Sequence, residues 1–184
     1  YINLFDKENS VSSPEFLSIY LSDRHNGVGG DGVILICPSE VADAEMRMFN
    51  LDGSEGMMCG NGIRCVAKYL FDNGITKGTK VGEGRYMLHI DTKSGVKECV
   101  AVTKNGLVSK VTVDMGKAEL APEKIPVRLE GDRVVDKPIS IGGNVYRITC
   151  VSMGNPHCVI FGGDPDGLDL PEIGPKFEHC LLYT

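Results

Sequence analysis

The clearest pattern of apolar and polar positions lies in the middle of the first 80 residues. From Glu45 to Asn50 the side chains largely alternate in polarity, which is typical of a half-buried strand. After a glycine-rich stretch, apolar residues recur at intervals of three and four, which predicts the buried face of a helix: Ile63, Val66, Ala67, Leu70 and Phe71. Asn73-Gly74 then supplies the left-handed residue that ends many helices. The pattern predicts a strand, a glycine-rich loop and a helix in succession.

A short strand is a candidate over Tyr1–Phe5, and two further elements are predicted between it and this unit. Ser13-Pro14 has the residue types that favour a helix cap and first turn. The apolar residues that follow predict the buried face of this helix: Phe16, Leu17, Tyr20 and Leu21. The continuous apolar run Val33–Cys37 predicts a buried strand.

The chain after the central helix is rich in strand patterns. Runs over 85–92, 96–103 and 107–115 are separated by turn residues, and Asn105-Gly106 between the last two predicts a tight hairpin. Residues 118–138 are mostly polar and contain three prolines, which indicates a crossing between domains. Strand patterns resume afterwards over 139–141 and 145–153.

Composition and charge limit the classes of function that this chain can have. The chain has 184 residues, 42% of them hydrophobic, which is enough for one domain or two small ones. The net charge of −6 is spread out without a basic block, so nucleic acid and acidic membrane surfaces are disfavoured as partners. No apolar run approaches the roughly 18 residues of a membrane span, and no signal peptide opens the sequence.

Cysteine usage favours a reducing compartment. The chain holds seven cysteines, an odd number, and none of them forms a Cys-x-x-C pair. A disulfide framework and a zinc site are therefore both poorly supported. Reduced thiols in a cytoplasmic protein are the simplest interpretation.

The glycine-rich loop places a thiol at the mouth of the predicted helix. Backbone N–H groups of a first helical turn lack partners within the helix and carry the positive end of its dipole. Gly60 and Gly62 would let an anion approach these amides, and the same field favours the thiolate of Cys59. A phosphate loop is excluded, because Ile63-Arg64 follows where Lys-Ser/Thr is required. From the local pattern alone, a buried structural cysteine at a tight turn accounts for Cys59 equally well.

Three amides and one histidine are candidate ligand contacts. Asn50 ends a strand beside the loop, and Asn61 stands at the start of the helix. Either could bind a ligand at a pocket rim, although a turn former and a helix cap are the commoner roles. Asn155 and His157 flank a proline that fixes the backbone between them, and histidine can move a proton near neutral pH. A structural histidine is the alternative there.

Taken together, these stretches resemble the diaminopimelate epimerase family. The resemblance rests on four segments in the order of the family: residues 24–34, 49–54, 58–65 and 154–157. It implies an α/β (α+β) fold with two similar domains, each a curled, mostly antiparallel sheet around a central helix. By this likeness residues 1–117 are the first epimerase domain without its N-terminal edge, and residues 118–184 are the start of an incomplete second one.

The resemblance also implies the chemistry. The family interconverts LL- and meso-diaminopimelate in lysine biosynthesis without a cofactor, pyridoxal phosphate or metal, by proton transfer between two cysteines and the α-carbon. Cys59 matches the first of these cysteines, and His157 matches a catalytic histidine near the reacting centre. The substrate-binding positions of the family correspond to Asn50, Gly60, Asn61, Gly62 and Asn155. A cytoplasmic homodimer with a small-molecule substrate is implied.

The sequence departs from the family pattern in two ways. The second catalytic cysteine of the family lies in a Cys-Gly-Thr-Gly-type segment, which does not occur here, so residues 1–184 alone are expected to be inactive. Gly32 stands where some members have a glutamine that touches the substrate.

Several alternatives stay open. A non-catalytic amino-acid-binding fragment or paralogue would keep the anion cradle and lack the second thiol. A proline-racemase-like isomerase would be expected to carry histidine at the position of Asn61, and phenazine-type isomerases lack the thiol of Cys59. A cysteine hydrolase would need His157 to approach Cys59 in the fold.

Overall fold

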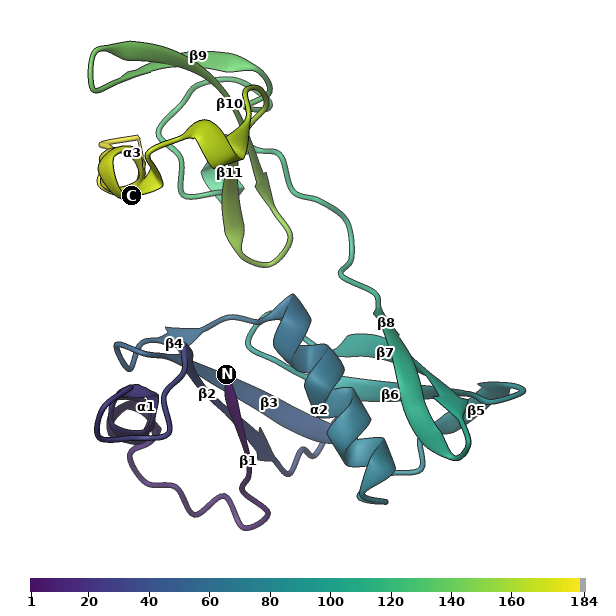
Figure 1. The fold of residues 1–184 in the computed structure, drawn as a ribbon. Coiled ribbons are helices and arrows are strands. Elements are labelled where there is room, and N and C mark those ends of the chain that lie inside the picture. The colour runs from purple at the N-terminus through teal and green to yellow at the C-terminus, as the bar shows by residue number, and fades with distance from the viewer. Residues whose placement is uncertain (183–184) are drawn as a thin grey trace. The chain divides into compact units, whose positions relative to one another are not determined.

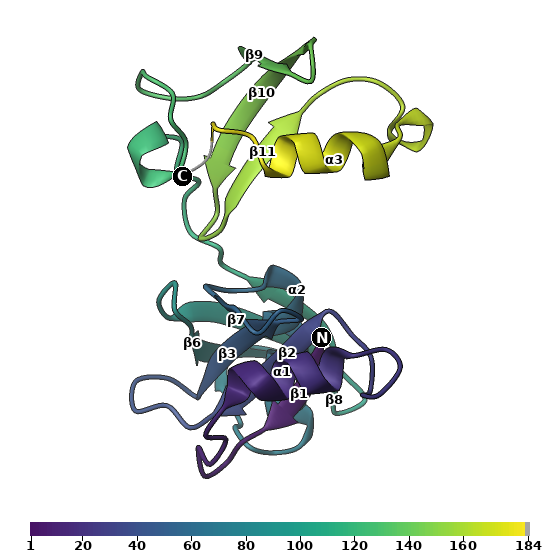
Figure 2. The ribbon, with the colours of Figure 1, turned by 90° about the vertical axis from the view of Figure 1, so that its left-hand side faces the viewer.

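The computed structural model describes residues 1–182 and divides the chain into two compact units, Tyr1–Met115 and Gly116–Thr184. Each unit has a sheet of its own, which Figure 1 and Figure 2 show in two views. The mixed α/β class that the sequence predicts is confirmed.

An eight-stranded sheet forms the framework of the first unit, with the strand order β1-β2-β3-β6-β7-β8. Two short strands lie off this path, β4 beside β3 and β5 beside β6. Most neighbours are antiparallel, but β1 pairs with β2 and β3 pairs with β6 in parallel. The bounds of the strands are β1 Ile2–Phe5, β2 Gly32–Cys37, β3 Ala44–Asn50, β4 Glu55–Gly56, β5 Thr79–Gly82, β6 Arg85–Asp91, β7 Lys97–Lys104 and β8 Leu107–Val113.

Two helices cover opposite faces of β2, which explains why this strand is apolar throughout. Ile34 and Ile36 belong to the core under α2 (Gly60–Asp72), whereas Val33 and Leu35 pack in a second cluster that includes Leu21 of α1 (Pro14–Ser22). Every residue of β2 is buried. A strand enclosed on both sides reads as a continuous hydrophobic run rather than an alternating one.

The central helix forms where the sequence predicts it, but it starts earlier. Gly60 is its first residue and Cys59 is its N-cap, so Asn61 lies in the first turn rather than at the cap. Four predicted apolar residues are fully buried on one face, and Phe71 packs beside them. Gly74 ends the helix with φ of +67°, as the sequence predicts.

The predicted buried face of α1 is wrong at two of its four positions. Leu17 and Leu21 are half-buried, and Leu21 packs in the cluster on this side of β2. Phe16 and Tyr20 are 69% and 63% exposed. The helix turns Pro14, Ser18 and Ser22 toward the sheet instead. The Ser18 hydroxyl lies 3.1 Å from the backbone oxygen of Phe49 and 2.8 Å from that of Asn50, so a polar contact at the end of β3 fixes the rotation of the helix. Ser13 is the N-cap but makes no side-chain capping hydrogen bond.

The hairpin between β7 and β8 is confirmed. Asn105 and Gly106 have φ values of +54° and +82°, the left-handed conformation at both central positions that a two-residue turn of this type requires. The turn brings β8 back along β7, so that both strands pack against α2.

A three-stranded antiparallel sheet with the order β11-β10-β9 forms the second unit. Its elements are the 3₁₀ helix η1 Pro122–Lys124, β9 Lys137–Ile141, β10 Asn144–Ser152, β11 Pro156–Ile160, the 3₁₀ helix η2 Pro165–Gly167 and α3 Leu170–Glu178. The core contains Ile125, Val134, Ile148 and Cys150, each no more than 1% exposed.

Two features of the second unit differ from the sequence-based expectations. Residues 118–138 are more than a crossing segment, because Ile125 and Val134 supply part of the core. The helix α3 is not predicted from the sequence, since it contains Pro175 and has no buried residue. Its N-cap Asp169 accepts a hydrogen bond of 3.1 Å from the Glu172 amide, which stabilises the first turn.

Candidate active site

The candidate nucleophile lies at the positive end of α2. Cys59 has an extended backbone (φ −126°, ψ 111°) and its side chain is half-buried. Its Sγ accepts a hydrogen bond of 3.3 Å from the Gly62 amide, in the position where a serine or aspartate usually caps a helix. The sulfur therefore lies at the end of the helix where the unpaired N–H groups and the positive end of the helix dipole are found.

The glycines beside Cys59 serve different purposes. A Cβ on Gly62 would overlap Cδ1 of the fully buried Ile34 and would lie 3.5 Å from Cys59 Sγ. Gly62 therefore allows the helix to pack closely on β2 under the thiol. A Cβ on Gly60 would meet only the Met115 side chain, whose Cε would lie at the ordinary distance of 3.6 Å. The sequence-based interpretation that both glycines admit a ligand applies better to Gly60.

Both polar atoms of the Asn50 side-chain amide make hydrogen bonds. Its Oδ1 accepts a hydrogen bond of 3.0 Å from the Tyr1 hydroxyl, and its Nδ2 donates one of 3.0 Å to Ser54 Oγ. Burial, followed by the negative charges of Cys59 and Asp31, raises the pKa of Tyr1. The phenol stays neutral and keeps donating to Asn50, which fixes the orientation of the amide.

An ion-pair cluster anchors the loop that leads to Cys59. Glu55 of β4 accepts hydrogen bonds from Arg47 Nε at 3.0 Å and Lys93 Nζ at 2.9 Å, and its side chain is 22% exposed. Burial alone would raise the pKa of Glu55, but the hydrogen bonds and charges of Lys93 and Arg47 outweigh it and hold the pKa below its usual value.

We expect Glu55→Gln to lower the free energy of unfolding at pH 7 by roughly 1 to 2 kcal/mol. A carboxylate with a lowered folded-state pKa stabilises the fold above its unfolded-state pKa of about 4.3, and loses this contribution as the pH falls through the folded-state value. Urea unfolding of both proteins between pH 7 and pH 3 measures the difference.

The free energies of unfolding of wild type and Glu55→Gln should become equal at the acid end of that pH series. Glu83→Gln is the matched control, because Glu83 is exposed and has no ion pair within the described part of the chain. A constant difference between wild type and Glu55→Gln down to pH 3 would contradict the electrostatic explanation.

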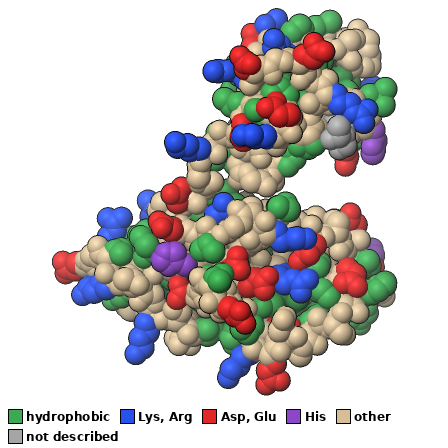
Figure 3. Space-filling view, turned by 180° about the vertical axis from the view of Figure 1, so that it is seen from behind, with side chains coloured by type: hydrophobic (Ala, Val, Ile, Leu, Met, Phe, Trp, Pro, Cys, Tyr) green, Lys and Arg blue, Asp and Glu red, His purple; other side chains and the backbone are tan. Residues whose placement is uncertain are grey.

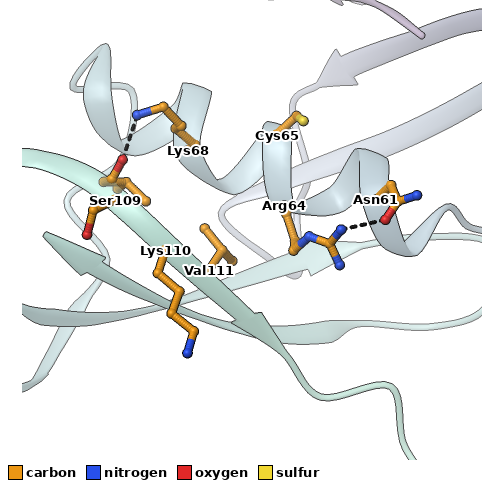
Figure 4. Close-up of a pocket in the computed structure, with 8 residues that line it drawn as sticks. Asn61, Arg64, Cys65, Lys68, Ser109, Lys110 and Val111 are labelled. Carbon is orange, nitrogen blue, oxygen red and sulfur yellow. Dashed lines mark hydrogen bonds between the residues drawn. The ribbon is translucent and has the colours of Figure 1, made fainter.

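Asn61 is oriented by a residue one turn further along the helix. Its Oδ1 accepts a hydrogen bond from Arg64 Nη2, as Figure 4 shows. Both residues line a groove of about 450 Å³ between α2 and β8, together with Cys65, Lys68, Val108, Ser109, Lys110 and Val111. Lys68 Nζ donates to the Val108 carbonyl at 2.6 Å and to Asp72 at 2.6 Å, which ties the helix to the strand.

The second unit brings two further candidates together. His157 Nε2 lies 3.1 Å from Asn155 Oδ1, which is a hydrogen bond in the tautomer that carries the proton on Nε2, because an amide oxygen only accepts. His157 is exposed, and Asn155 is half-buried. His157 also lines a pocket of about 350 Å³ beside β11, together with Ile125, Pro126, Val127, Pro156, Cys158 and Glu178.

The structure thus distributes the candidate residues over two units. Asn50, Gly60, Asn61 and Gly62 lie with Cys59 in the first unit. Asn155 and His157 lie in the second unit.

Sequence reasoning missed two residues that position the candidates. Tyr1 reaches Asn50 because β1 lies parallel to β2, a pairing for which a single sequence gives no local signal. Arg64 could have been found, because residues three apart on a helix are neighbours.

Neither a metal-ligand group nor a membrane-spanning helix is found among the described residues. Within 1–182, no group of three or more histidine, cysteine, aspartate or glutamate side chains could hold a metal ion. None of the helices in that range is long and apolar enough to cross a membrane. On the face of the first unit in Figure 3, acidic and basic side chains are interspersed.

Comparison with known proteins shows the family of the chain. The family model described as diaminopimelate epimerase matches residues 1–121. The chain belongs to the diaminopimelate epimerase family. The diaminopimelate epimerase of Desulfovibrio desulfuricans is 48% identical over all of this chain and 63% of its own length. That of Agathobacter rectalis is 46% identical over all of this chain and 64% of its own length. The chain therefore spans somewhat less than two thirds of these curated relatives.

Solved structures confirm the fold of this diaminopimelate epimerase family member. A probable proline racemase from Agrobacterium radiobacter superposes with a TM-score of 0.63 over 90% of this chain and 42% of the racemase, at 18% identity. A hydroxyproline epimerase from Agrobacterium vitis gives 0.60 over 87% of this chain and 40% of that enzyme, at 17% identity. At these identities the likeness concerns the fold alone.

Proposed function

We propose that this chain is part of a cofactor-independent epimerase that interconverts LL- and meso-diaminopimelate by proton transfer at the α-carbon. The observation that carries the proposal is the Cys59 thiol, held by the Gly62 amide at the N-terminus of α2 in a chain of this family. The proposal assigns residues 1–117 to the first epimerase domain and residues 118–184 to the second.

The α-carboxylate of the substrate would bind at the first turn of α2. The Gly62 amide already donates to Cys59 Sγ, so the amides of Gly60 and Asn61 are left for the carboxylate. Negative charge that develops on the carboxylate as the proton leaves would be stabilised by these N–H groups. Cys59 would then be the base that removes the proton from one face of the α-carbon.

The remaining candidates would bind and orient the substrate. Asn50 and Asn155 can both donate and accept hydrogen bonds, which suits a ligand with ammonium and carboxylate groups at each end. His157 would act near the reacting centre, and its hydrogen bond to Asn155 supports a fixed ring orientation. Inversion also needs a proton donor on the opposite face, because Cys59 can serve only one.

A cytoplasmic homodimer is part of the same proposal. All seven cysteines are free in the structure, in keeping with a reducing compartment. Light scattering of the purified protein measures the oligomeric state directly.

Exchange of the α-proton with solvent tests the proposed function. LL-diaminopimelate is incubated in D₂O with this chain and, separately, with a protein of the relatives' full length. We expect deuterium at the α-carbon, and inversion to the meso isomer, with the longer protein. Calorimetric binding of the substrate without any exchange by either protein would support the binding module instead.

A further inference from the structure

Two cysteines that have no part in the proposed reaction face each other in the second unit. Cys150 of β10 and Cys158 of β11 are direct partners in the antiparallel register. Side chains of directly opposed residues project from the same face of a sheet. Both thiols are free in the structure.

The backbone hydrogen bonds show which kind of pair this is. The Cys150 amide donates to the Val134 carbonyl at 2.9 Å, and Ser152 exchanges two hydrogen bonds of 2.9 Å with Glu119. Cys150 and Ser152 therefore direct these backbone groups away from β11. Because Cys150 makes no backbone hydrogen bond to the residue opposite it, Cys150 and Cys158 form a non-hydrogen-bonded pair. Such pairs have Cα atoms about 4.5 Å apart, within the range of about 4.4 to 6.8 Å that a disulfide spans.

The two thiols differ in their surroundings. Cys150 is fully buried in the core cluster, whereas Cys158 is half-buried and lines the pocket beside His157. Burial raises the pKa of Cys150 to about 12, with smaller contributions from the charge and the hydrogen bond of Cys158. Cys150 therefore stays protonated at neutral pH, and the accessible Cys158 is the sulfur that an oxidant reaches first.

We propose that Cys150 and Cys158 form a redox modification site, at which a hydroperoxide joins β10 to β11 by a cross-strand disulfide. In the first step the Cys158 thiolate attacks the peroxide oxygen, which forms a sulfenic acid and releases hydroxide. Cys150 sulfur then attacks the Cys158 sulfur and loses its proton, and the sulfenic oxygen leaves as water. With hydrogen peroxide, two thiols are oxidised to one disulfide and the peroxide is reduced to two waters.

The disulfide would close the turn that carries Asn155 and His157. Residues 151–157 lie between the two cysteines, so the bond would restrict the separation of the strands at the base of this turn. The site does not depend on the proposed epimerase activity, because it follows from strand register and burial alone.

The test uses the whole reduced chain and hydrogen peroxide. After mild oxidation under native conditions, the protein is unfolded, its free thiols are alkylated, and it is digested with trypsin and analysed by mass spectrometry. Trypsin cuts after Arg147 and Lys176, so both cysteines lie in one peptide. We expect the linked peptide to be 148–176, with an internal disulfide between Cys150 and Cys158 and no alkyl group. It should be absent in Cys158→Ser, and after dithiothreitol both of its cysteines should be alkylated. Cys65→Ser is the matched control, because Cys65 is exposed on α2 and is not part of the β10–β11 pair. The Cys65→Ser protein should give the same linked peptide as the wild type.

Two outcomes would overturn the proposal. One is a sulfinic acid on Cys158 with Cys150 still open to alkylation after unfolding, and the other is a linkage of Cys158 to Cys180. Circular dichroism before and after oxidation checks that the fold is retained. Cys150→Ala serves as a second variant that keeps the apolar core, and in this protein oxidised Cys158 should accumulate as sulfenic acid without the linked peptide.

Discussion

Cys59→Ser in the longer protein should lower the rate of α-proton exchange roughly a thousandfold. A serine hydroxyl fills nearly the same space and can still accept the hydrogen bond from the Gly62 amide. It is a far weaker acid than a thiol, so the helix terminus cannot maintain it as an anion at neutral pH. Solvent deuterium incorporation into LL-diaminopimelate measures the loss, and substrate binding by calorimetry should change little.

Cys65→Ser is the control for this experiment. Cys65 lies on the same helix, but it is exposed and six residues further along. Its exchange rate should stay close to that of the wild type. If Cys59→Ser exchanged the α-proton at the wild-type rate, Cys59 would not be the base, and a structural role for this cysteine would be favoured.

Gly32→Ala should be the most destabilising of the glycine substitutions in the first unit, by about 3 kcal/mol. Gly32 begins β2 with φ of +145°, a conformation that side chains disfavour. An added Cβ would overlap the Phe49 carbonyl oxygen and lie 2.6 Å from Cε1 of Tyr1. The backbone oxygen cannot move away without disturbing the pairing of Gly32 with Asn50. A glutamine at this position, as in some family members, would need a different local backbone.

The free energy of unfolding from urea titration measures this effect. Gly82→Ala is the matched control, since Gly82 lies in β5 of the same unit and its added Cβ would come no closer than 3.4 Å to the Arg85 side chain. Its stability should change by less than about 1 kcal/mol. Equal losses in the two variants would show that the close approach at Gly32 is relieved by small local shifts.

Elements with a strong local pattern could be predicted from the sequence. The regular spacing of Ile63, Val66 and Leu70 defined α2, and Asn105-Gly106 defined a hairpin. The orientation of α1 could not be predicted, because a hydrogen bond from Ser18 to the distant end of β3 decides it over the apolar Phe16 and Tyr20. A pattern of apolar residues measures burial only where packing alone sets the rotation of the helix.

The candidate site was predictable to a similar degree. The glycines and the helix behind Cys59 indicated an anion cradle. The different roles of Gly60 and Gly62 could not be predicted, because they depend on the packing of Ile34 under Gly62. The contact between Tyr1 and Asn50 depends on the parallel pairing of β1 and β2, which has no signature within either strand.

The pairing of β3 with β6 has a consequence for the order in which the first unit comes apart. These strands meet at only two residue pairs, Ala44 with Ile90 and Glu45 with Asp91. The sheet is therefore two smaller sheets joined at a narrow seam, and α2 packs across both in one core. Opening the seam requires α2 to detach, so the α2 amides beyond the first turn, which are hydrogen-bonded within the helix, should exchange with solvent no faster than the whole unit unfolds. The helix that carries Cys59 therefore also holds the two parts of this sheet together.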